Sequence, residues 1–181
     1  MADVTIENIV ASAQLADKLD IQQIADAIPE SKYNPDNFPG LILHFEEPKS
    51  AILLFSSGKF ICTGTKRMED VSITLQKLVS KMHVIGINVE KQPEMKVQNI
   101  VISADLGKEF QLTVIAKGLL QQNVEYEPEQ FPGLIYRMDD AGTVILLFSS
   151  GKLVCTGAKA IEEAAAAVNL MKEKLASLGV L

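Results

Sequence analysis

The sequence predicts an α+β protein in which two similar repeats contribute antiparallel strands to one continuous, curved sheet. A long segment occurs twice: residues 38–66 and 131–159 align without a gap and share 17 of 29 positions. Each repeat shows the same order of elements, which is strand, helix, three strands, helix. The predicted helices are amphipathic, so they can cover one side of such a sheet. We place the first repeat at 1–92 and the second at 93–181.

Each repeat opens with a strand and a short helix. The strand 4–13 matches 95–104, and Asn8 and Asn99 occupy the same position in the two strands. The helix that follows has one apolar stripe, formed by Ile21, Ile24, Ala25 and Ile28 in the first repeat and by Leu112, Ile115, Ala116 and Leu119 in the second. Prolines then mark an irregular stretch before the next strand.

Three short strands and a second helix complete each repeat. We expect strands at about 41–47, 50–56 and 59–65, and again at 134–140, 143–149 and 152–158. Ser-Ser-Gly at 56–58 and at 149–151 predicts a tight hairpin turn. The buried stripe of the last helix is Val71, Leu75, Leu78, Val79 and Met82, or Ala164, Val168, Met171 and Leu175. Residues 84–94 link the repeats and leave open a further short strand.

The strands carry more apolar residues than one face of a sheet needs. Alternate side chains face opposite sides, and the helices can cover only one of them. That covered side suits Ile9, Ile52, Leu54, Phe60 and Cys62. The other side, which we call the open face, then carries Asn8, Val10, Leu53, Phe55, Ile61 and Thr63 in the first repeat and Asn99, Val101, Leu146, Phe148, Val154 and Thr156 in the second. Either this face binds a partner, or a second sheet or a dimer partner covers it.

Composition and charge narrow the function. The formal net charge is −6, which argues against a protein that is basic all over. Cys62 and Cys155 occupy equivalent positions, so we expect free buried thiols rather than a disulfide, as suits a reducing compartment. No apolar run approaches the ~20 residues of a membrane span, and the first residues lack signal-peptide features. The sequence therefore predicts a soluble, intracellular protein that does not enter a membrane.

No pattern in the sequence predicts an enzyme, a cofactor or a metal site. His44 and His83 are not duplicated and have no evident Cys or carboxylate constellation. Ser-Ser-Gly-Lys lacks the upstream glycine and the following hydroxyl residue of a phosphate-binding loop. One alternative stays open, which is an enzyme or carrier that holds an apolar small molecule on the open face. It would need a polar catalytic group there, and only Asn and Thr are present.

The repeated motifs resemble those of the TATA-box-binding proteins. They are Asn-Ile-Val, Tyr-x-Pro-x-x-Phe-Pro-Gly-Leu-Ile, Leu-Leu-Phe-Ser-Ser-Gly-Lys and Cys-Thr-Gly-x-Lys, each present twice and in the same order. The resemblance covers nearly the whole chain and favours an archaeal member of the family. It implies a saddle-shaped sheet with helices on the convex face. This family is itself the known example of minor-groove binding with a sharp DNA kink.

The resemblance implies a role for each group of open-face residues. Phe38 and Phe55, and Phe131 and Phe148, would be paired wedges that unstack one base step at each end of the site. Val10, Leu53, Ile61, Val101, Leu146 and Val154 would lie against the groove floor and sugars. Asn8, Asn99, Thr63 and Thr156 would face the central base pairs. Lys59, Lys152, Lys66, Lys159 and Arg137 are candidates for phosphate contacts, and His44 replaces Arg137 in the first repeat.

The resemblance also implies partners. It predicts a general transcription initiation factor that binds double-stranded promoter DNA and recruits transcription factor B and RNA polymerase. Glu127 and Glu129, in the acidic loop before Phe131, would contact factor B, whereas the first repeat has Asn34 and Asp36 there. Free molecules are candidates for a homodimer through the apolar face. The expected location is the archaeal cytoplasm, at the nucleoid, or the nucleus of a eukaryote.

Overall fold

The computed structural model describes residues 3–120, 122–138 and 142–181. The chain forms two compact units: unit 2 is Asn8–Gln98, and unit 1 combines Met1–Glu7 with Asn99–Leu181. Strands β1 (Val4–Gln14) and β5 (Lys96–Asp105) each contribute residues to both units. Side-chain hydrogen bonds between β1 and β5 occur inside each unit, from Gln98 to Ser12 and from Ser103 to Glu7.

The remaining strands follow the predicted order along the chain. Unit 2 contains β2 (Leu41–Glu46), β3 (Lys49–Leu54) and β4 (Lys59–Thr65). Unit 1 contains β6 (Val124–Glu125), β7 (Leu134–Arg137), β8 (Val144–Leu147) and β9 (Lys152–Ala158). In the described residues the hydrogen-bonded order is β2-β3-β4-β1-β5-β9-β8-β7-β6. The predicted α+β class, with both repeats in one antiparallel sheet, is confirmed.

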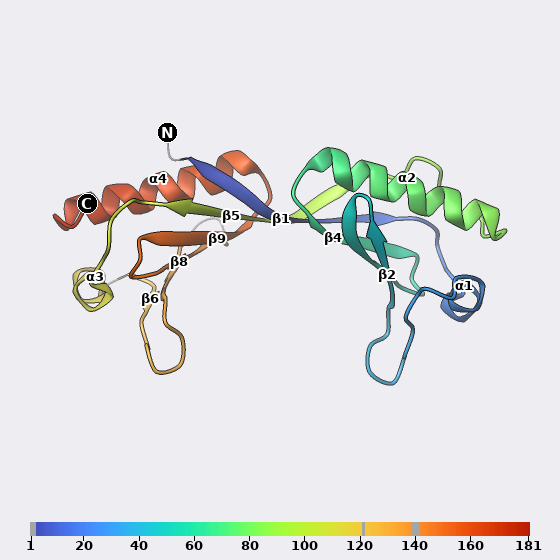
Figure 1. Cartoon of the computed structure of the whole chain (residues 1–181), viewed down its shortest axis with the longest axis horizontal. Helices are drawn as coiled ribbons and strands as arrows, with labels where there is room; N and C mark the ends of the chain where they lie inside the picture. Colours follow the sequence, from blue (N-terminus) through green and yellow to red (C-terminus); the bar gives the residue numbers. More distant parts are fainter. Residues whose placement is uncertain (1–2, 121, 139–141) are drawn as a thin grey trace. The chain divides into compact units, whose positions relative to one another are not determined.

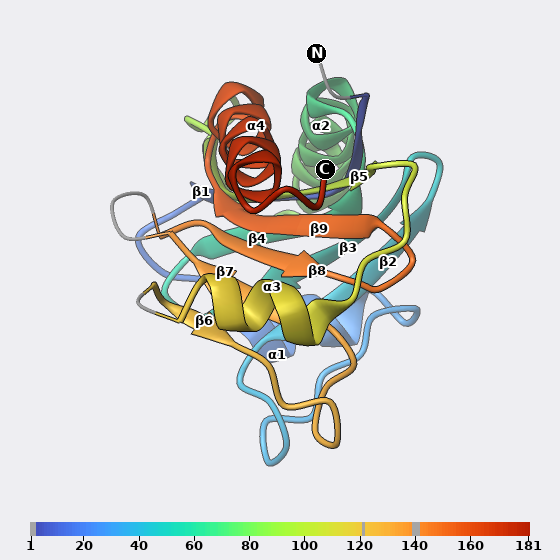
Figure 2. The ribbon, with the colours of Figure 1, turned by 90° about the vertical axis from the view of Figure 1, so that its left-hand side faces the viewer.

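In the described part of the chain, two short and two long helices accompany these strands. They are α1 (Ile21–Ala27), α2 (Met68–Val84), α3 (Leu112–Gly118) and α4 (Ile161–Ser177). In unit 2, α2 packs on β4, and in unit 1, α4 packs on β9, as Figures 1 and 2 show. The buried stripes predicted for both long helices are confirmed. None of the helices in the described part of the chain is long and apolar enough to cross a membrane.

The core of each unit lies between the sheet and its long helix. Ile9, Ile52, Leu54, Phe60 and Cys62 are all buried, as predicted for the covered side. A buried hydrogen bond of 3.1 Å joins the Ser50 and Thr74 hydroxyls, and so ties β3 to α2. This contact confirms that the even-numbered residues of β3 face the helix. The odd-numbered residues therefore face away from it, on the open face.

The observed elements differ from the predicted ones at their edges. Unit 1 has one strand that was not predicted, β6, which pairs with β7. Unit 2 has only an isolated bridge between Lys32 and Ile42 at the matching position. The sequence left open whether the linker 84–94 contains a short strand, and the structure has no strand there. The strand predicted at 134–140 ends at Arg137, and residues 139–140 lie outside the described part of the chain.

Candidate nucleic-acid interface

The open face of each unit carries one row of side chains that crosses neighbouring strands. The strand register joins Ile42 to Leu53, Leu53 to Ile61, and Ile61 to Ser12 in unit 2. In unit 1 the same row runs Ile135, Leu146, Val154, Ser103. Its apolar members are only partly buried. The structure thus brings together the predicted residues Leu53 with Ile61 and Leu146 with Val154.

Sequence reasoning missed the outer members of these rows. Ile42 and Ile135 belong to the open face because they pair with Leu53 and Leu146 in the adjacent strands. Their alternation with the buried residues Leu41, Leu43 and Leu134 was the available signal. Ser12 and Ser103 gave no such signal, because a lone serine in a strand fits either face. The apolar floor of each unit is therefore one residue wider than predicted.

A glycine bulge positions the predicted asparagine and threonine. The register between β1 and β4 shifts between Ile9 and Ala11, next to Gly64, whose φ is 87°. This φ favours glycine, because a Cβ is strained in the left-handed region. The bulged Gly64 N–H donates to Asn8 Oδ1 at 2.7 Å, and Asn8 Nδ2 donates to Thr63 Oγ1 at 3.1 Å. The Cys-Thr-Gly motif thus supplies a buried residue, an open-face hydroxyl and the bulge.

Unit 1 repeats this arrangement. Gly157 N–H donates to Asn99 Oδ1 at 2.7 Å, and Asn99 Nδ2 donates to Thr156 Oγ1 at 3.0 Å. Because the asparagine oxygen accepts from the backbone, the orientation of each amide is defined. One amide N–H of each asparagine remains to donate outward, as far as the described residues show. The threonine hydroxyl makes only a long contact with the asparagine Oδ1, at 3.4 Å for Thr63 and 3.5 Å for Thr156, and can rotate to donate outward as well. Each pair therefore presents hydrogen-bond donors on the open face.

Two phenylalanines meet in each unit, one from the loop before β2 or β7 and the other from the turn after β3 or β8. The rings of Phe38 and Phe55 are edge to face, with centroids 5.9 Å apart and planes at 69°. Phe131 and Phe148 repeat the contact at 5.9 Å and 65°. Phe38 is 37% exposed, and the other three rings are partly exposed. The four phenylalanines that were predicted to be wedges thus form two pairs of partly exposed rings. Phenylalanines of a hydrophobic core would be buried instead.

The glycine of Phe-Pro-Gly makes room for each ring pair. A Cβ on Gly40 would lie 2.8 Å from Phe38 Cε1 and 2.9 Å from Phe55 Cε1. On Gly133 it would lie 2.8 Å and 3.0 Å from the corresponding atoms of Phe131 and Phe148. These distances are shorter than normal carbon contacts. A side chain at either position would therefore displace the rings.

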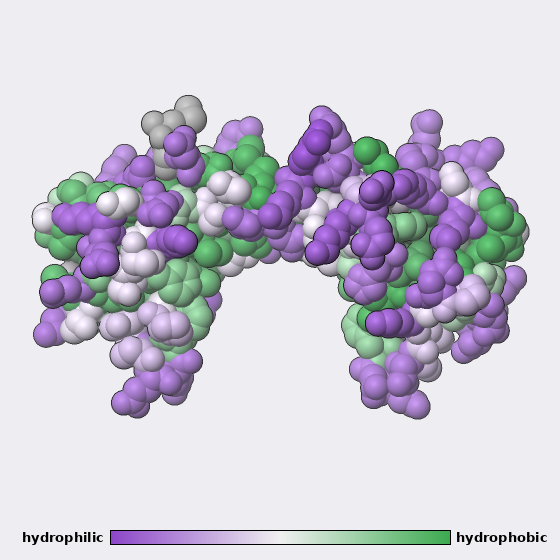
Figure 3. Space-filling model, in the orientation of Figure 1, coloured by the Kyte–Doolittle hydropathy of each residue, from purple (hydrophilic) through white to green (hydrophobic). Residues whose placement is uncertain are grey.

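Backbone hydrogen bonds hold the segments that carry the phenylalanines. The Phe55 and Gly58 N–H groups close the hairpin turn, with Lys59 and Phe55 as acceptors. The same bonds join Phe148, Gly151 and Lys152. Phe38 and Phe131 follow turns in which their N–H groups donate to Asn34 and Glu127. Figure 3 shows the surface of the loops that precede β2 and β7, at the foot of each unit, as mostly hydrophilic.

The predicted phosphate-binding residues are exposed, but their surroundings differ. Lys59 and Lys152 begin β4 and β9, and both side chains are exposed. Arg137 forms an ion pair with Glu125, with 3.6 Å between Nε and Oε1. Sequence reasoning missed this pair, because β6 was not predicted. Surface pairs of this kind contribute little stability, so the pair tempers the positive charge of Arg137 without fixing the fold.

The loop with Glu127 and Glu129 is exposed and acidic. Glu127 accepts the N–H groups of Gln130 and Phe131 through its backbone carbonyl, both at 2.9 Å. With Glu125, Gln130, Phe131, Gly133 and Ile135 it lines a small cavity of about 110 Å³. The acidic loop therefore adjoins one phenylalanine of the unit 1 pair.

The two cysteines lie in the core of their units. Both are free and buried, as predicted. Burial raises the pKa of each thiol to about 11, because the thiolate is poorly solvated there. Within residues 3–120, 122–138 and 142–181, no group of three or more His, Cys, Asp or Glu side chains is placed to hold a metal ion.

Comparison with known proteins identifies the family. Residues 3–85 and 94–178 each match the family model described as "Transcription factor TFIID (or TATA-binding protein, TBP)". The TATA-box-binding protein of Archaeoglobus fulgidus is 49% identical over 178 residues, which are 98% of this chain and 97% of the relative. That of Thermoplasma acidophilum is 51% identical, with the same coverage of both chains.

A solved structure agrees with the sequence relatives. The Methanococcus jannaschii TBP has a TM-score of 0.88 and 42% sequence identity, and the match covers 96% of this chain and 98% of that one. The family model, the relatives and this structure each cover both repeats. The predicted resemblance is thereby confirmed, and the chain belongs to the TATA-box-binding protein family.

Proposed function

We propose that the open faces of both units bind the minor groove of A·T-rich promoter DNA. Family membership makes the chain a TATA-box-binding transcription initiation factor rather than an enzyme. The observation that carries the finer proposal is the duplicated open face: an apolar row, an Asn–Thr donor pair and a partly exposed phenylalanine pair in each unit.

The donor pairs account for a preference for A·T. In the minor groove, adenine N3 and thymine O2 are acceptors, whereas guanine adds an N2 amine donor. The outward N–H of Asn8 and the hydroxyl of Thr63 would satisfy these acceptors, as would Asn99 and Thr156. A guanine amine would lie against Leu53, Ile61, Leu146 or Val154 without a partner, which costs free energy. A·T and T·A are not distinguished in this way.

The phenylalanine pairs account for bending. A ring inserted between base pairs unstacks the step, which costs about a few kcal/mol and is offset by contact with the widened groove. Paired apolar rings that are partly exposed on the loops flanking the strands suit this role. Val10 and Val101 would extend the contact with sugars, and Lys59, Lys152, Lys66, Lys159 and Arg137 would hold phosphates.

We infer that the acidic loop recruits protein partners. Glu127 and Glu129 are exposed next to Phe131, so a basic partner could contact protein and kinked DNA together. Transcription factor B is the partner proposed, and RNA polymerase would follow through it. In the absence of DNA, the apolar rows would pair two copies into a homodimer. DNA binding would place the chain at the nucleoid.

A gel shift tests the proposal. The full chain should bind an A·T octamer in preference to one in which G·C replaces the central pairs, by 10-fold or more, since each mismatch costs about 1–3 kcal/mol. Equal binding of the two octamers would contradict the proposal. Reversing the charges of Glu127 and Glu129 to Lys should leave this DNA preference unchanged and weaken the complex with factor B.

A further inference from the structure

The rows of the open face end differently in the two units. In unit 2, Gln98 Nε2 donates to Ser12 Oγ at 2.8 Å. In unit 1, Ser103 Oγ donates to Glu7 Oε1 at 2.7 Å. The two serines hold equivalent places in the register, opposite Ile61 and Val154. One apolar row therefore ends in an amide, and the otherwise matching row ends in a carboxylate.

This difference changes what the row can offer to DNA. A glutamine amide can donate a second hydrogen bond, and it is neutral. A carboxylate accepts hydrogen bonds only, and its negative charge disfavours a nearby phosphate. The groove walls present phosphate and sugar oxygens, which are acceptors. Gln98 thus suits a DNA backbone better than Glu7 does.

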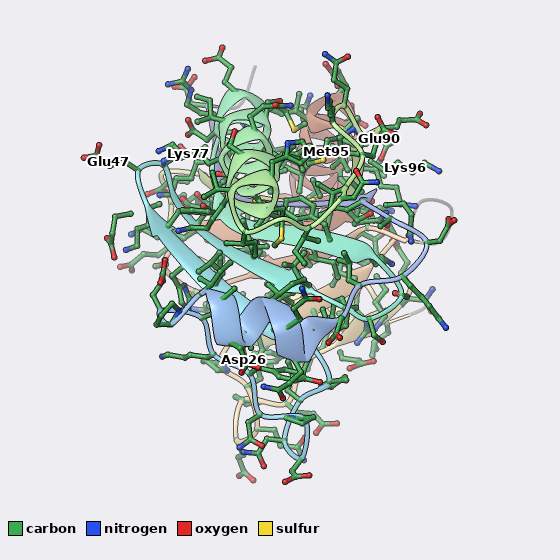
Figure 4. All side chains as sticks on the ribbon, turned by 90° about the vertical axis from the view of Figure 1, so that its right-hand side faces the viewer. Asp26, Glu47, Lys77, Glu90, Met95 and Lys96 are labelled. Carbon is green, nitrogen blue, oxygen red and sulfur yellow. The ribbon has the colours of Figure 1, made fainter. Side chains whose placement is uncertain are left out.

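The surroundings of the two residues differ in the same direction. Glu7 lines a cavity of about 780 Å³ in unit 1, where Asp3 and Asp105 add two carboxylates and Lys152 is the one cation among the lining residues that the structure describes. Gln98 lines a cavity of about 490 Å³ in unit 2. There, Glu90 and Glu94 are matched by Lys59 and Lys96, and Figure 4 shows Glu90 and Lys96 on the same side of the unit.

The outer strands show an independent difference of the same sign. In unit 1, Arg137 is paired with Glu125. In unit 2, the matching positions hold His44 and Lys32, since Lys32 bridges Ile42 as Glu125 pairs with Ile135. Glu125 in unit 1 thus corresponds to Lys32 in unit 2. With His neutral, the outer pair sums to zero in unit 1, where Arg137 offsets Glu125, and to +1 in unit 2, so unit 1 is the more negative at both places.

We propose that Glu7 and Gln98 set the orientation of the chain on DNA, with unit 2 on the half whose backbone has the more negative potential, such as the half with the narrower minor groove. The proposal rests on the open faces binding DNA. Because the repeats are otherwise so similar, this matched difference beside Ser12 and Ser103, reinforced by the outer strands, can decide between the two orientations. Glu7 and Gln98 are therefore specificity-determining residues for direction, whereas the Asn–Thr pairs select base composition.

The test needs DNA in which charge is the only asymmetry. A self-complementary A·T octamer offers both orientations equally, and methylphosphonate linkages neutralise the phosphates of one half. A DNA-cleaving reagent is attached at Glu109→Cys, an exposed position in unit 1 next to Phe110, whose N–H donates to Ser149. The buried native thiols stay unlabelled. Cleavage then reports which half lies under unit 1.

We expect cleavage to favour the neutralised half about fivefold, the effect of one charge several ångströms from a phosphate near a protein surface. The exchange of Glu7→Gln with Gln98→Glu keeps the net charge and should move the preference toward the other half. If that variant does not fold, Glu7→Gln alone should bring the cleavage ratio close to one.

Equal cleavage of both halves by the chain with native Glu7 and Gln98 would overturn the proposal. So would a cleavage ratio that neither variant moves. Binding of unmodified A·T and G·C octamers is measured alongside. A chain that prefers A·T but shows no orientation contradicts this inference alone, whereas loss of the A·T preference contradicts the proposed function.

Discussion

Phe38 and Phe55 lie edge to face, with ring centroids 5.9 Å apart, although they come from different motifs of the repeat. Edge-to-face pairs of this kind are favourable, at about 0.5–1.5 kcal/mol beyond the area they bury. Core phenylalanines such as Phe60 are fully buried, whereas Phe38 is 37% exposed. The Phe38–Phe55 pair is thus a preformed apolar contact that is accessible at the surface. Its exposure suits contact with another molecule.

Replacing Phe55 and Phe148 with Ala should reduce DNA bending more than it disturbs folding. Both rings are partly exposed, so their removal leaves little cavity. Bending is measured by energy transfer between dyes at the ends of the DNA, and folding by thermal melting. The matched control is Phe60→Ala in the core, where we expect a loss of about 3–5 kcal/mol. Melting of the double variant as low as that of the control would mean that Phe55 and Phe148 are core residues.

Replacing Gly40 with Ala should displace both rings of the unit 2 pair. The added Cβ would lie within 3.0 Å of Phe38 and of Phe55, and ring atoms can move more easily than backbone. We expect changed aromatic NMR signals for these two residues and weaker bending, with melting little affected. Gly86→Ala is the control, because a Cβ there meets no atom within 4 Å, although its positive φ adds strain. Unchanged signals from Phe38 and Phe55 would show that the glycine does not shape the pair.

Replacing Thr63 with Val should reduce the ratio of the affinity for the A·T octamer to the affinity for the G·C octamer. The substitution removes one outward donor and leaves Asn8 Nδ2 without its acceptor, and a lost hydrogen bond costs about 1 kcal/mol, or roughly fivefold in affinity. Titration of both octamers measures the effect. Thr113→Val, exposed on α3, should leave both affinities unchanged. A variant that weakens the two octamers equally would contradict the role of this pair in selection.

The raised pKa of Cys62 and Cys155, about 11 against an ordinary 9.0, predicts slow alkylation and a loss of stability in alkali. At pH 8 the thiolate fraction, and so the reaction with iodoacetamide, should be about 100-fold lower than in the denatured chain. Between pH 9 and 11 the unfolded state releases protons that the folded state keeps. The free energy of unfolding should therefore fall as pH rises through this window. Fast labelling of the native chain at pH 8 would show that the thiols are accessible.

Much of the fold could be predicted because the sequence repeats its own signals. Alternation assigned Leu53 and Ile61 to the open face, and the register places them side by side. The helical stripes ending at Met82 and Leu175 are buried as predicted. A feature that occurs at the same position in both repeats is rarely accidental, so each prediction for the first repeat could be checked against the second.

The remaining features depend on contacts that no local pattern encodes. The pair of Phe38 and Phe55 requires two turns to converge over Gly40, which only the folded chain reveals. The bond from Gly64 to Asn8 depends on a bulge between strands 56 residues apart in sequence. β6 was missed because two residues are too short for a periodic signal. Its ion pair with Arg137 was missed with it.

Inosine-substituted DNA tests the central claim, that the open face reads the minor groove, most directly. An inosine·cytosine pair presents the minor-groove pattern of A·T, because it lacks the guanine amine, and keeps the major-groove acceptors of G·C. Octamers with A·T, inosine·cytosine and G·C central pairs are titrated with the full chain. We predict that the inosine octamer binds within about threefold of the A·T octamer and at least 10-fold more tightly than the G·C octamer. An inosine octamer that binds as weakly as the G·C octamer would contradict the claim.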